Sequence, residues 1–345
     1  MHNYEVPVAD LDEAVEQARS DWLSLNGARI FISGGTGYIG RWLLEAFRHA
    51  NAELDLGIAI TVLSRDPAKF LSTCPHLRDD GITYIKGDVR DFVFPSGKFT
   101  HVIHAATDVI AQQAPLHTFD VTTLGTRRVL DFCRSASVQR VLLLSSGAIY
   151  GRIPPEVFGV PEEYQGCPEL SSPRSAYGLG KIITEWLGAA YSSESQMVCS
   201  SARVFAQVGP LLALDKQFAA GNFILNALNN EPFVIRGDGT PCRSYMYATD
   251  LVRWLLAILV RGGANTAYNV GSDESISIQD LARRIALLAG ISTPDVRVAL
   301  KATPGQPPER YVPDISRARS TLGVDILVSL DDSFTRTIDW YRQFN

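Results

Sequence analysis

The stretch that decides the fold reads Ala28-Arg29-Ile30-Phe31-Ile32-Ser33-Gly34-Gly35-Thr36-Gly37-Tyr38-Ile39-Gly40. Its apolar first half predicts a buried parallel strand, and residues 41–47 after it predict a helix. Gly34 allows a tight turn, Gly37 leaves bare backbone for a pyrophosphate, and Gly40 lets the helix pack closely on the strand. The sequence therefore predicts a dinucleotide-binding turn. Because the spacing is GxxGxxG rather than GxGxxG, a glycine-rich turn without a ligand is the alternative.

The start of the predicted helix completes this motif. The first N–H groups of a helix have no partner inside it and carry a partial positive charge, which suits phosphate. We therefore expect the backbone of Tyr38, Ile39 and Gly40 to face the dinucleotide, together with Gly34 and Gly37.

A second pattern, Tyr177-Gly178-Leu179-Gly180-Lys181, places a tyrosine and a lysine on one face of a predicted helix. The Lys181 ammonium is expected to lower the pKa of Tyr177 from its reference of about 10, so that its hydroxyl can serve as a general acid or base. A solvated helix face is the other interpretation of the pair. Upstream, an apolar strand ends in Ser145 and Ser146.

In this order and spacing, the three pieces resemble the extended short-chain dehydrogenase/reductase family, in particular its nucleotide-sugar epimerases, dehydratases and ketoreductases. The resemblance covers the chain from about Ala28 onward. It implies an α/β fold, namely a Rossmann-type doubly wound parallel sheet with a smaller C-terminal α/β substrate-binding lobe. We expect a helical extension over residues 1–27, the dinucleotide-binding domain over 28–210, and the lobe, partly interleaved with it, over 211–345.

The resemblance also implies which residues hold a nicotinamide dinucleotide. Besides the glycine turn, they are Ser64, Arg65, Asp88, Val89, Ala105, Ala106, Tyr177 and Lys181. After the second strand an acid would bind the free ribose hydroxyl of NAD, whereas Ser64 and Arg65 suit the phosphate of NADP. The pair favours NADP over NAD, although a small shift in register would bring Asp66 to the ribose.

A nucleotide-diphosphate sugar is the substrate that the resemblance implies. Gly237-Asp238-Gly239 followed by Arg243, and later Arg310, match positions where the family holds the diphosphate with arginine, whose planar fork donates paired hydrogen bonds. Thr107 and Ser146 are expected beside the sugar.

Several positions depart from the family pattern or have two interpretations. Thr122 stands where the family usually has an Asn that supports the active site, and Ala206 stands where a substrate-contacting Asn is usual. His104, at the end of a predicted strand, is expected to be a packed histidine rather than a catalytic base.

The residues after Ser146 bear on the reaction. The resembled 4,6-dehydratases carry Asp-Glu there, to protonate a leaving hydroxyl and to remove the C5 proton, and Gly147 and Ala148 can do neither. We expect an NAD(P)-dependent oxidoreductase with Ser146, Tyr177 and Lys181 as catalytic residues, acting at C4 as an epimerase or ketoreductase. A 4,6-dehydratase and a non-catalytic NAD(P)-binding sensor are the alternatives.

Composition limits the class of protein. The chain has 345 residues, of which 46% are hydrophobic and 20% charged, with a formal net charge of −5. No basic block is visible, which argues against a nucleic-acid partner. The five cysteines form no CxxC pair, so no metal site or disulfide framework is indicated, and a cytoplasmic setting is expected. With no signal-peptide core and no apolar run of membrane length, we expect no membrane partner, and a homodimer.

Overall fold

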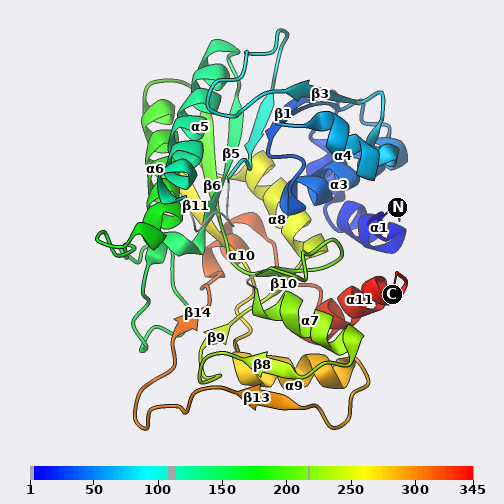
Figure 1. Cartoon of the computed structure of the whole chain (residues 1–345). Coiled ribbons are helices and arrows are strands. Elements are labelled where there is room, and N and C mark those ends of the chain that lie inside the picture. Colours follow the sequence, from blue (N-terminus) through cyan, green and yellow to red (C-terminus); the bar gives the residue numbers. More distant parts are fainter. Residues whose placement is uncertain (1–3, 108–113, 217, 345) are drawn as a thin grey trace.

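The computed structural model describes residues 4–107, 114–216 and 218–344. Within them the chain forms a seven-stranded parallel sheet in the order β11-β6-β5-β4-β1-β2-β3 (Figure 1). Its strands are β1 (Arg29–Ser33), β2 (Ala59–Ser64), β3 (Ile82–Lys86), β4 (His101–His104), β5 (Arg140–Ser146), β6 (Val198–Val204) and β11 (Thr266–Val270). The Rossmann-type α/β fold expected from the glycine turn is confirmed.

The strand order explains where a ligand can lie. The chain runs outward from β1 through β2 and β3, and then returns to the other side of β1 with β4. In an open parallel sheet such a reversal leaves a crevice at the carboxyl ends of the two strands involved. Those ends are Ser33 and His104. The glycine turn and the residues after His104 therefore meet at this crevice.

Helices cover both faces of the sheet, and the central strands β1 and β5 are accordingly buried at every residue after the first (Figure 1). On one face α5 and α6 pack together against β4, β5 and β6, and on the other α3 packs with α8. These helices are α3 (Tyr38–Leu54), α5 (Pro115–Ser135), α6 (Ala176–Ser193) and α8 (Ala248–Arg261). The shorter elements are α4 (Pro67–Thr73) and the 3₁₀ turns η1 (Pro75–Leu77), η2 (Gly147–Tyr150) and η3 (Pro173–Ser175).

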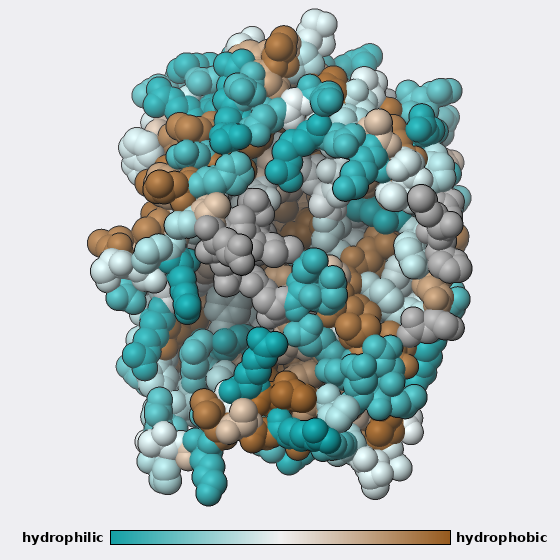
Figure 2. Space-filling model, viewed as in Figure 1, coloured by the Kyte–Doolittle hydropathy of each residue, from teal (hydrophilic) through white to brown (hydrophobic). Residues whose placement is uncertain are grey.

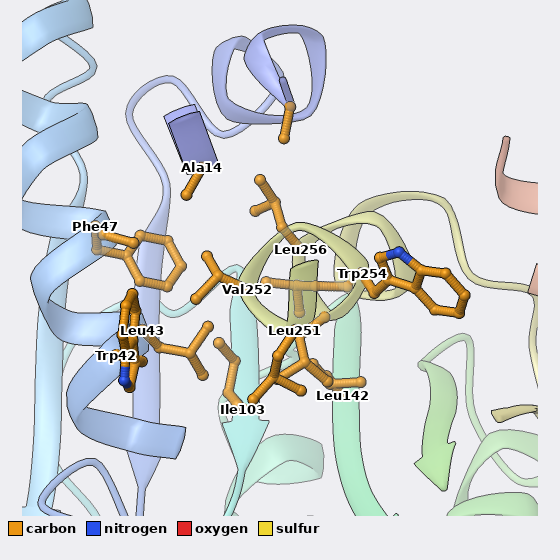
Figure 3. Close-up of a cluster of buried hydrophobic side chains, with 14 of the residues drawn as sticks. Ala14, Trp42, Leu43, Phe47, Ile103, Leu142, Leu251, Val252, Trp254 and Leu256 are labelled. Carbon is orange, nitrogen blue, oxygen red and sulfur yellow. The ribbon is translucent and has the colours of Figure 1, made fainter. Parts of the chain in front are cut away.

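The N-terminal segment packs on the α3–α8 layer through α1 (Val8–Glu16) and α2 (Arg19–Leu23). Figure 3 shows Ala14 of α1 facing the layer in which Phe47 of α3 and Val252 of α8 lie, and all three side chains are buried. The extension is therefore part of the sheet domain's hydrophobic core. Residues 1–3 of the extension lie outside the described residues.

The same extension also reaches the C-terminal lobe. Asp10 accepts a hydrogen bond from the Tyr247 hydroxyl at 2.6 Å and pairs with Arg336 at 3.1 Å. Trp340 donates to the Glu5 carbonyl at 3.1 Å. These contacts join the two parts of the molecule on the side away from α5 and α6 (Figure 1).

The lobe has a hydrophobic core of its own and lies below the sheet in Figure 1. Its main elements are α7 (Ala219–Asn229), β8 (Phe233–Ile235), α9 (Ile278–Leu288), β13 (Val296–Val298) and α11 (Leu330–Arg342). Its remaining strands are two residues long: β7 (Gln207–Val208), β9 (Cys242–Arg243), β10 (Met246–Tyr247), β12 (Ile276–Ser277) and β14 (Arg310–Tyr311). Of these, β7 pairs with β10, and β9 lies between β12 and β14.

The lobe and the sheet domain are interleaved in sequence. Residues 211–345 contribute α8 to one face of the sheet and β11 to its edge, where β11 pairs in parallel with β6. A short helix, α10 (Ser316–Leu322), also packs against β11. The last strand of the sheet is thus β11, which the sequence analysis did not assign to it.

The face shown in Figure 2 is mostly hydrophilic, with apolar side chains in small groups between the polar ones. None of the helices in the described ranges is long and apolar enough to cross a membrane.

Candidate functional site

The glycine turn lies at the crevice, between β1 and α3. Gly34 has a φ of +76°, and a Cβ atom on it would lie 2.5 Å from the backbone nitrogen of Ala106. A Cβ atom on Gly40 would overlap the carbonyl oxygen of Gly34. Packing within the chain therefore requires glycine at both positions.

Gly37 has no such requirement. Its φ is −82°, and among the described residues a Cβ atom on it would meet only the carbonyl oxygen of Gly34, at an ordinary 3.5 Å. This open backbone lies at the first turn of α3, where the N–H groups of Tyr38 and Ile39 form the positive end of the helix. The Tyr38 side chain is turned toward Gly209. The geometry fits a pyrophosphate held by backbone.

The predicted adenosine end lies on the next two strand ends. Ser64 is buried at the end of β2, and Arg65 after it is exposed. Asp66 accepts a hydrogen bond from the backbone of Lys69 at 3.1 Å, so this acid serves as the cap of α4. Asp88 follows β3, and hydrogen bonds from Arg90 lower its pKa to about 2, with a smaller contribution from the Arg65 charge.

The other predicted cofactor residues differ in their surroundings. Ala105 and Ala106 follow β4 and touch Gly34, so the structure brings the two predicted turns together. Val89 is 7% exposed and packs against Gly125 of α5 within the core. Its side chain therefore serves mainly to pack α5 against the sheet.

The three predicted catalytic residues meet at the carboxyl end of β5. Ser146 ends this strand, and Tyr177 lies in the first turn of α6, near enough for the Ser146 hydroxyl to lower the pKa of Tyr177. Lys181, one turn further along α6, is buried. Its Nζ lies 5.7 Å from the centre of the Tyr177 ring and donates to the Leu144 carbonyl at 2.6 Å. The shared helix face predicted from the spacing is present, and the catalytic roles remain predictions.

The predicted effect of Lys181 on Tyr177 is wrong for this structure. Burial raises the pKa of Tyr177, and the nearby Ser146 hydroxyl opposes that rise. Burial also lowers the pKa of Lys181 to about 8, with Glu185 acting in the opposite direction. Helical spacing fixes which residues share a face but not how deeply they are buried, and here desolvation outweighs the charge. Ser146 is the group that favours the Tyr177 phenolate.

His104 is a packed histidine, as expected. Its Nδ1 hydrogen-bonds with Ser33 Oγ at 2.7 Å and its Nε2 with Thr126 Oγ1 at 3.0 Å. Burial lowers its pKa to about 3. Thr122 donates a hydrogen bond to its own helix, and its Oγ1 lies 3.4 Å from that of Thr107. Thr107 therefore contacts α5 beside the crevice.

The two predicted diphosphate ligands lie on neighbouring strands of the lobe. Arg243 of β9 stands opposite Tyr311 of β14, and Arg310 precedes it. Arg243 donates to the Glu309 carboxylate at 2.9 Å, while the Arg310 guanidinium lies 4.8 Å from the centre of the Phe158 ring. The short sheet thus carries both arginines on the lobe side of the site.

Three residues on this side were missed by the sequence analysis. The Tyr311 hydroxyl lies beside Gly147, where a Cβ atom would come within 2.6 Å of it. Within the described parts of the chain, Gln207 Oε1, Ser244 Oγ and Arg310 Nε are buried without a hydrogen-bond partner. Unpaired buried polar atoms are costly, so such atoms suit a site that bonds a ligand. Tyr311 directly follows a predicted ligand, whereas no sequence signal marks Gln207 or Ser244.

The arrangement provides hydroxyl acid–base groups, an open helix N-terminus for phosphate, and arginines for an anion. The described residues hold no group of three or more His, Cys, Asp or Glu side chains that could bind a metal ion.

Solved structures with this fold include several sugar-nucleotide enzymes. An epimerase from Methanothermobacter thermautotrophicus superposes with a TM-score of 0.79 at 24% identity, covering 95% of this chain and 96% of that one. A UDP-glucose 4-epimerase from Thermotoga maritima, solved with UDP-glucose, has a TM-score of 0.76 at 21% identity, covering 92% and 99%. At these identities the likeness shows the fold.

Sequence comparison identifies the family to which the chain belongs. A UDP-glucuronic acid decarboxylase from Xenopus tropicalis is 28% identical over 317 residues, which are 91% of this chain and 72% of the relative. The sequence model of the NAD dependent epimerase/dehydratase family matches residues 30–271, which include the glycine turn, Ser146, Tyr177 and Lys181. The chain therefore belongs to the NAD-dependent epimerase/dehydratase family, as an enzyme of the extended short-chain dehydrogenase/reductase type.

Proposed function

We propose that this protein oxidises or reduces C4 of a nucleotide-diphosphate sugar, through Tyr177, Ser146 and Lys181. The observation that carries the proposal is that Ser146 ends β5 while Tyr177 and Lys181 lie in the first two turns of α6, which packs against that strand, with the Lys181 Nζ 5.7 Å from the centre of the Tyr177 ring. These groups lie at the carboxyl ends of the parallel strands, where ligands of such sheets bind.

Each of the three residues has a distinct task in this proposal. Tyr177 takes the proton of the sugar hydroxyl as the carbon is oxidised, or returns it on reduction. Ser146 bonds the same sugar oxygen and stabilises the Tyr177 phenolate. Lys181, whose pKa burial lowers to about 8, remains charged at neutral pH and holds the nicotinamide ribose. The bound NAD(P) supplies the hydride acceptor or donor.

We propose that the glycine turn, Ala105 and Ala106 hold the pyrophosphate end of the dinucleotide, and that Arg65 favours NADP. Arg65 is exposed, and one oxygen of the neighbouring Asp66 carboxylate is engaged by the backbone of Lys69 as the cap of α4. Arg65→Ala should then weaken NADP binding about ten- to hundredfold and leave NAD binding unchanged, by calorimetry. Equal losses for the two dinucleotides would reject the preference.

For the sugar, we propose that Arg243 and Arg310 hold the diphosphate of a UDP-sugar. The buried unpaired atoms of Gln207, Ser244 and Arg310 support a polar ligand between the lobe and the sheet. UDP is the first nucleotide to test, because a similar structure contains UDP-glucose and the Xenopus relative is named for UDP-glucuronic acid.

The outcome at C4 is best described as epimerisation or net reduction, because Gly147 and Ala148 offer no acid or base for dehydration. An epimerase interconverts UDP-glucose and UDP-galactose without net change of the dinucleotide. A ketoreductase consumes reduced dinucleotide with a 4-keto sugar. Incubation with each substrate, followed by chromatography and nicotinamide absorbance, separates the two. If the protein converts neither substrate and binds no nucleotide sugar, the result favours the alternative of a non-catalytic NAD(P)-binding sensor.

Decarboxylation is a second candidate, favoured by the decarboxylase relatives. Once C4 is a ketone, a carboxylate at C6 belongs to a β-keto acid, which loses CO₂ without a base to remove the C5 proton. Residues 147 and 148 would then have no proton to remove before CO₂ leaves. Release of CO₂ from UDP-glucuronic acid is the test, and Tyr177→Phe should abolish it.

We also propose a homodimer formed through the outer face of α5 and α6. Leu124 of α5 is 52% exposed and Trp186 of α6 is 64% exposed, on two helices that pack side by side. Large apolar side chains grouped on one face are typical of association surfaces. Sedimentation should give a dimer that Trp186→Glu dissociates. A wild-type monomer at all concentrations would contradict this.

A further inference from the structure

The loop between η2 and η3, residues 152–172, reaches from the sheet domain to the lobe. Val160 of this loop forms a parallel bridge with Pro313, which follows β14. The Val160 N–H donates to the Val312 carbonyl at 2.9 Å, and the Val160 carbonyl accepts from the Asp314 N–H at 3.0 Å. The loop is therefore held by its backbone against the segment of the lobe that carries Arg310.

Gly159 shows how closely the loop lies on this segment. A Cβ atom on Gly159 would lie 3.2 Å from the carbonyl oxygen of Pro313 and 3.3 Å from the backbone nitrogen of Asp314. Both distances are tighter than an ordinary van der Waals contact, so a side chain at Gly159 would push the loop away. The bridge runs parallel, so Phe158, which comes directly before Gly159, lies level with β14.

Phe158 makes the contact that links the loop to a predicted diphosphate ligand. The Arg310 guanidinium lies over the Phe158 ring, 4.8 Å from its centre. A cation over an aromatic ring is attracted by the negative face of the ring. The Phe158 ring is 69% exposed, so a substitution there should leave the hydrophobic core of the protein intact.

The two arginines of the short sheet are held in different ways. Arg243 donates to the Glu309 carboxylate, which also neutralises its charge. In the described ranges of the chain, Arg310 forms no ion pair with a carboxylate, and its Nε is buried without a hydrogen-bond partner. The N–H groups of a guanidinium lie in its plane, so a ring on its face leaves them available. Phe158 thus holds Arg310 without cancelling its charge.

We propose that Phe158 is a positioning residue that orients the Arg310 guanidinium toward the diphosphate of the bound sugar nucleotide. The inference rests on the proposed function, since it takes Arg310 as a diphosphate ligand. Ordering a long side chain at the moment of binding costs affinity, and a contact that holds the side chain beforehand lowers this cost. The loop of the sheet domain would then prepare an arginine of the lobe for its ligand.

A double-mutant cycle, measured by calorimetry with UDP, tests this role. Phe158→Leu keeps an apolar side chain but removes the aromatic face, and should weaken UDP binding about two- to fivefold, the equivalent of one exposed cation–π contact. Phe158→Trp offers a ring that attracts cations more strongly, and should bind UDP at least as tightly as the wild type. In the Arg310→Ala background, Phe158→Leu should have no further effect, because the cation that it orients is gone.

Two controls keep the test specific. Phe94→Leu removes another ring that lies under an arginine, 4.0 Å from the Arg128 guanidinium in the sheet domain, and should leave UDP affinity unchanged. Leu170→Ala removes a 77% exposed side chain of the same loop and should also leave it unchanged. Equal losses from Phe158→Leu with and without the Arg310 side chain would overturn the inference, because the ring would then act on UDP directly. Wild-type affinity for UDP in Phe158→Leu would overturn it as well.

The same measurements separate this inference from the proposed function. If Arg310→Ala weakens UDP binding and Phe158→Leu does not, the positioning role of Phe158 fails while the diphosphate role of Arg310 stands. If Arg310→Ala binds UDP like the wild type, that part of the proposed function fails, and the inference fails with it. Neither result bears on the chemistry at C4, which the turnover of Tyr177→Phe tests.

Discussion

On the sheet side of the site, Ser146 and the turns after β1 and β4 stand at the ends of strands of four to seven residues that are paired in register with their neighbours, and Tyr177 and Lys181 stand on the long helix α6 that packs against β5. On the lobe side, Arg243, Arg310 and Tyr311 stand on strands of two residues. The first arrangement fixes position through many backbone hydrogen bonds. The second relies on side-chain contacts such as Arg243 with Glu309. The comparison suggests that the sheet sets the chemistry and the lobe sets what is bound.

The largest effect is expected at Gly37 on the sheet side, which is predicted to face the dinucleotide, in contrast to Gly34, which packing within the chain requires. Gly37→Val should abolish dinucleotide binding while the protein stays folded, because its side chain would enter space that the chain leaves open. Gly34→Val is the matched control and should prevent stable folding, since a Cβ atom there meets Ala105 and Ala106. Calorimetry and circular dichroism measure the two results. Unchanged NAD(P) affinity in Gly37→Val would show that the motif is only a turn.

Next in size is the loss of the acid–base group. Tyr177→Phe keeps the ring and should lower turnover by roughly a hundred- to ten-thousandfold, the usual contribution of a general acid–base. Tyr191→Phe, in the same helix and bonded to Asp131, is the control that should change little. Steady-state kinetics, with dinucleotide affinity measured separately, decide between these outcomes. Near-normal turnover in Tyr177→Phe would show that Tyr177 is not the general acid–base of the reaction.

A third prediction concerns the stability cost of this site. Burial lowers the pKa of Lys181 from 10.5 to about 8. At about 1.4 kcal/mol per pKa unit, the charged lysine costs the fold on the order of 3 kcal/mol below pH 8. Lys181→Met should therefore be more stable than the wild type at neutral pH, although less active.

The sign of the pH dependence checks this prediction. Because the folded pKa lies below the unfolded one, the unfolded chain binds more protons between about pH 8 and 10.5. Wild-type stability should gain over this window relative to Lys181→Met, so the difference between the two proteins shrinks. Urea unfolding at several pH values measures it. A constant difference would mean that Lys181 is not held in a desolvated site.

The smallest effect is expected on the lobe side. Arg243→Ala should weaken binding of the nucleotide sugar about ten- to hundredfold, the loss of a charge-assisted hydrogen bond, and leave dinucleotide binding unchanged. Arg284→Ala removes another lobe arginine, paired with Asp331, and should affect neither ligand. Calorimetry with UDP alone and with NAD gives both affinities. If Arg243→Ala lowered the affinity for NAD more than the affinity for UDP, relative to the wild type, the division between the two sides would be contradicted.

The sheet side was predictable because its signals are local. The glycine turn is one contiguous run, and Tyr177 and Lys181 are separated by one helical turn. The direction of the Tyr177 pKa shift was not predictable in this way, because it depends on burial by residues distant in sequence. Val89 shows the same limit: its place in the motif was recognised, but its packing against Gly125 depends on α5.

The lobe side was less predictable because its strands are too short for any periodicity to appear. The pairing of β9 with β14 brings Arg243 beside Tyr311, which is 68 residues later in the sequence. No local sequence pattern predicts this pairing. β11 was missed as a sheet strand for a related reason, since its partner β6 lies more than sixty residues earlier. The two arginines were found through the family resemblance alone.

The central claim is that hydrogen is removed from, or delivered to, C4 of a nucleotide sugar. It is tested most directly by single-turnover measurement with UDP-sugars deuterated at C4 or at C5. Deuterium at C4 should slow the change in nicotinamide absorbance, because the bond from C4 to hydrogen breaks in that step, whereas deuterium at C5 should not slow it. An absorbance change that is equally fast with and without deuterium at C4, in a protein that still converts the sugar, would contradict the account.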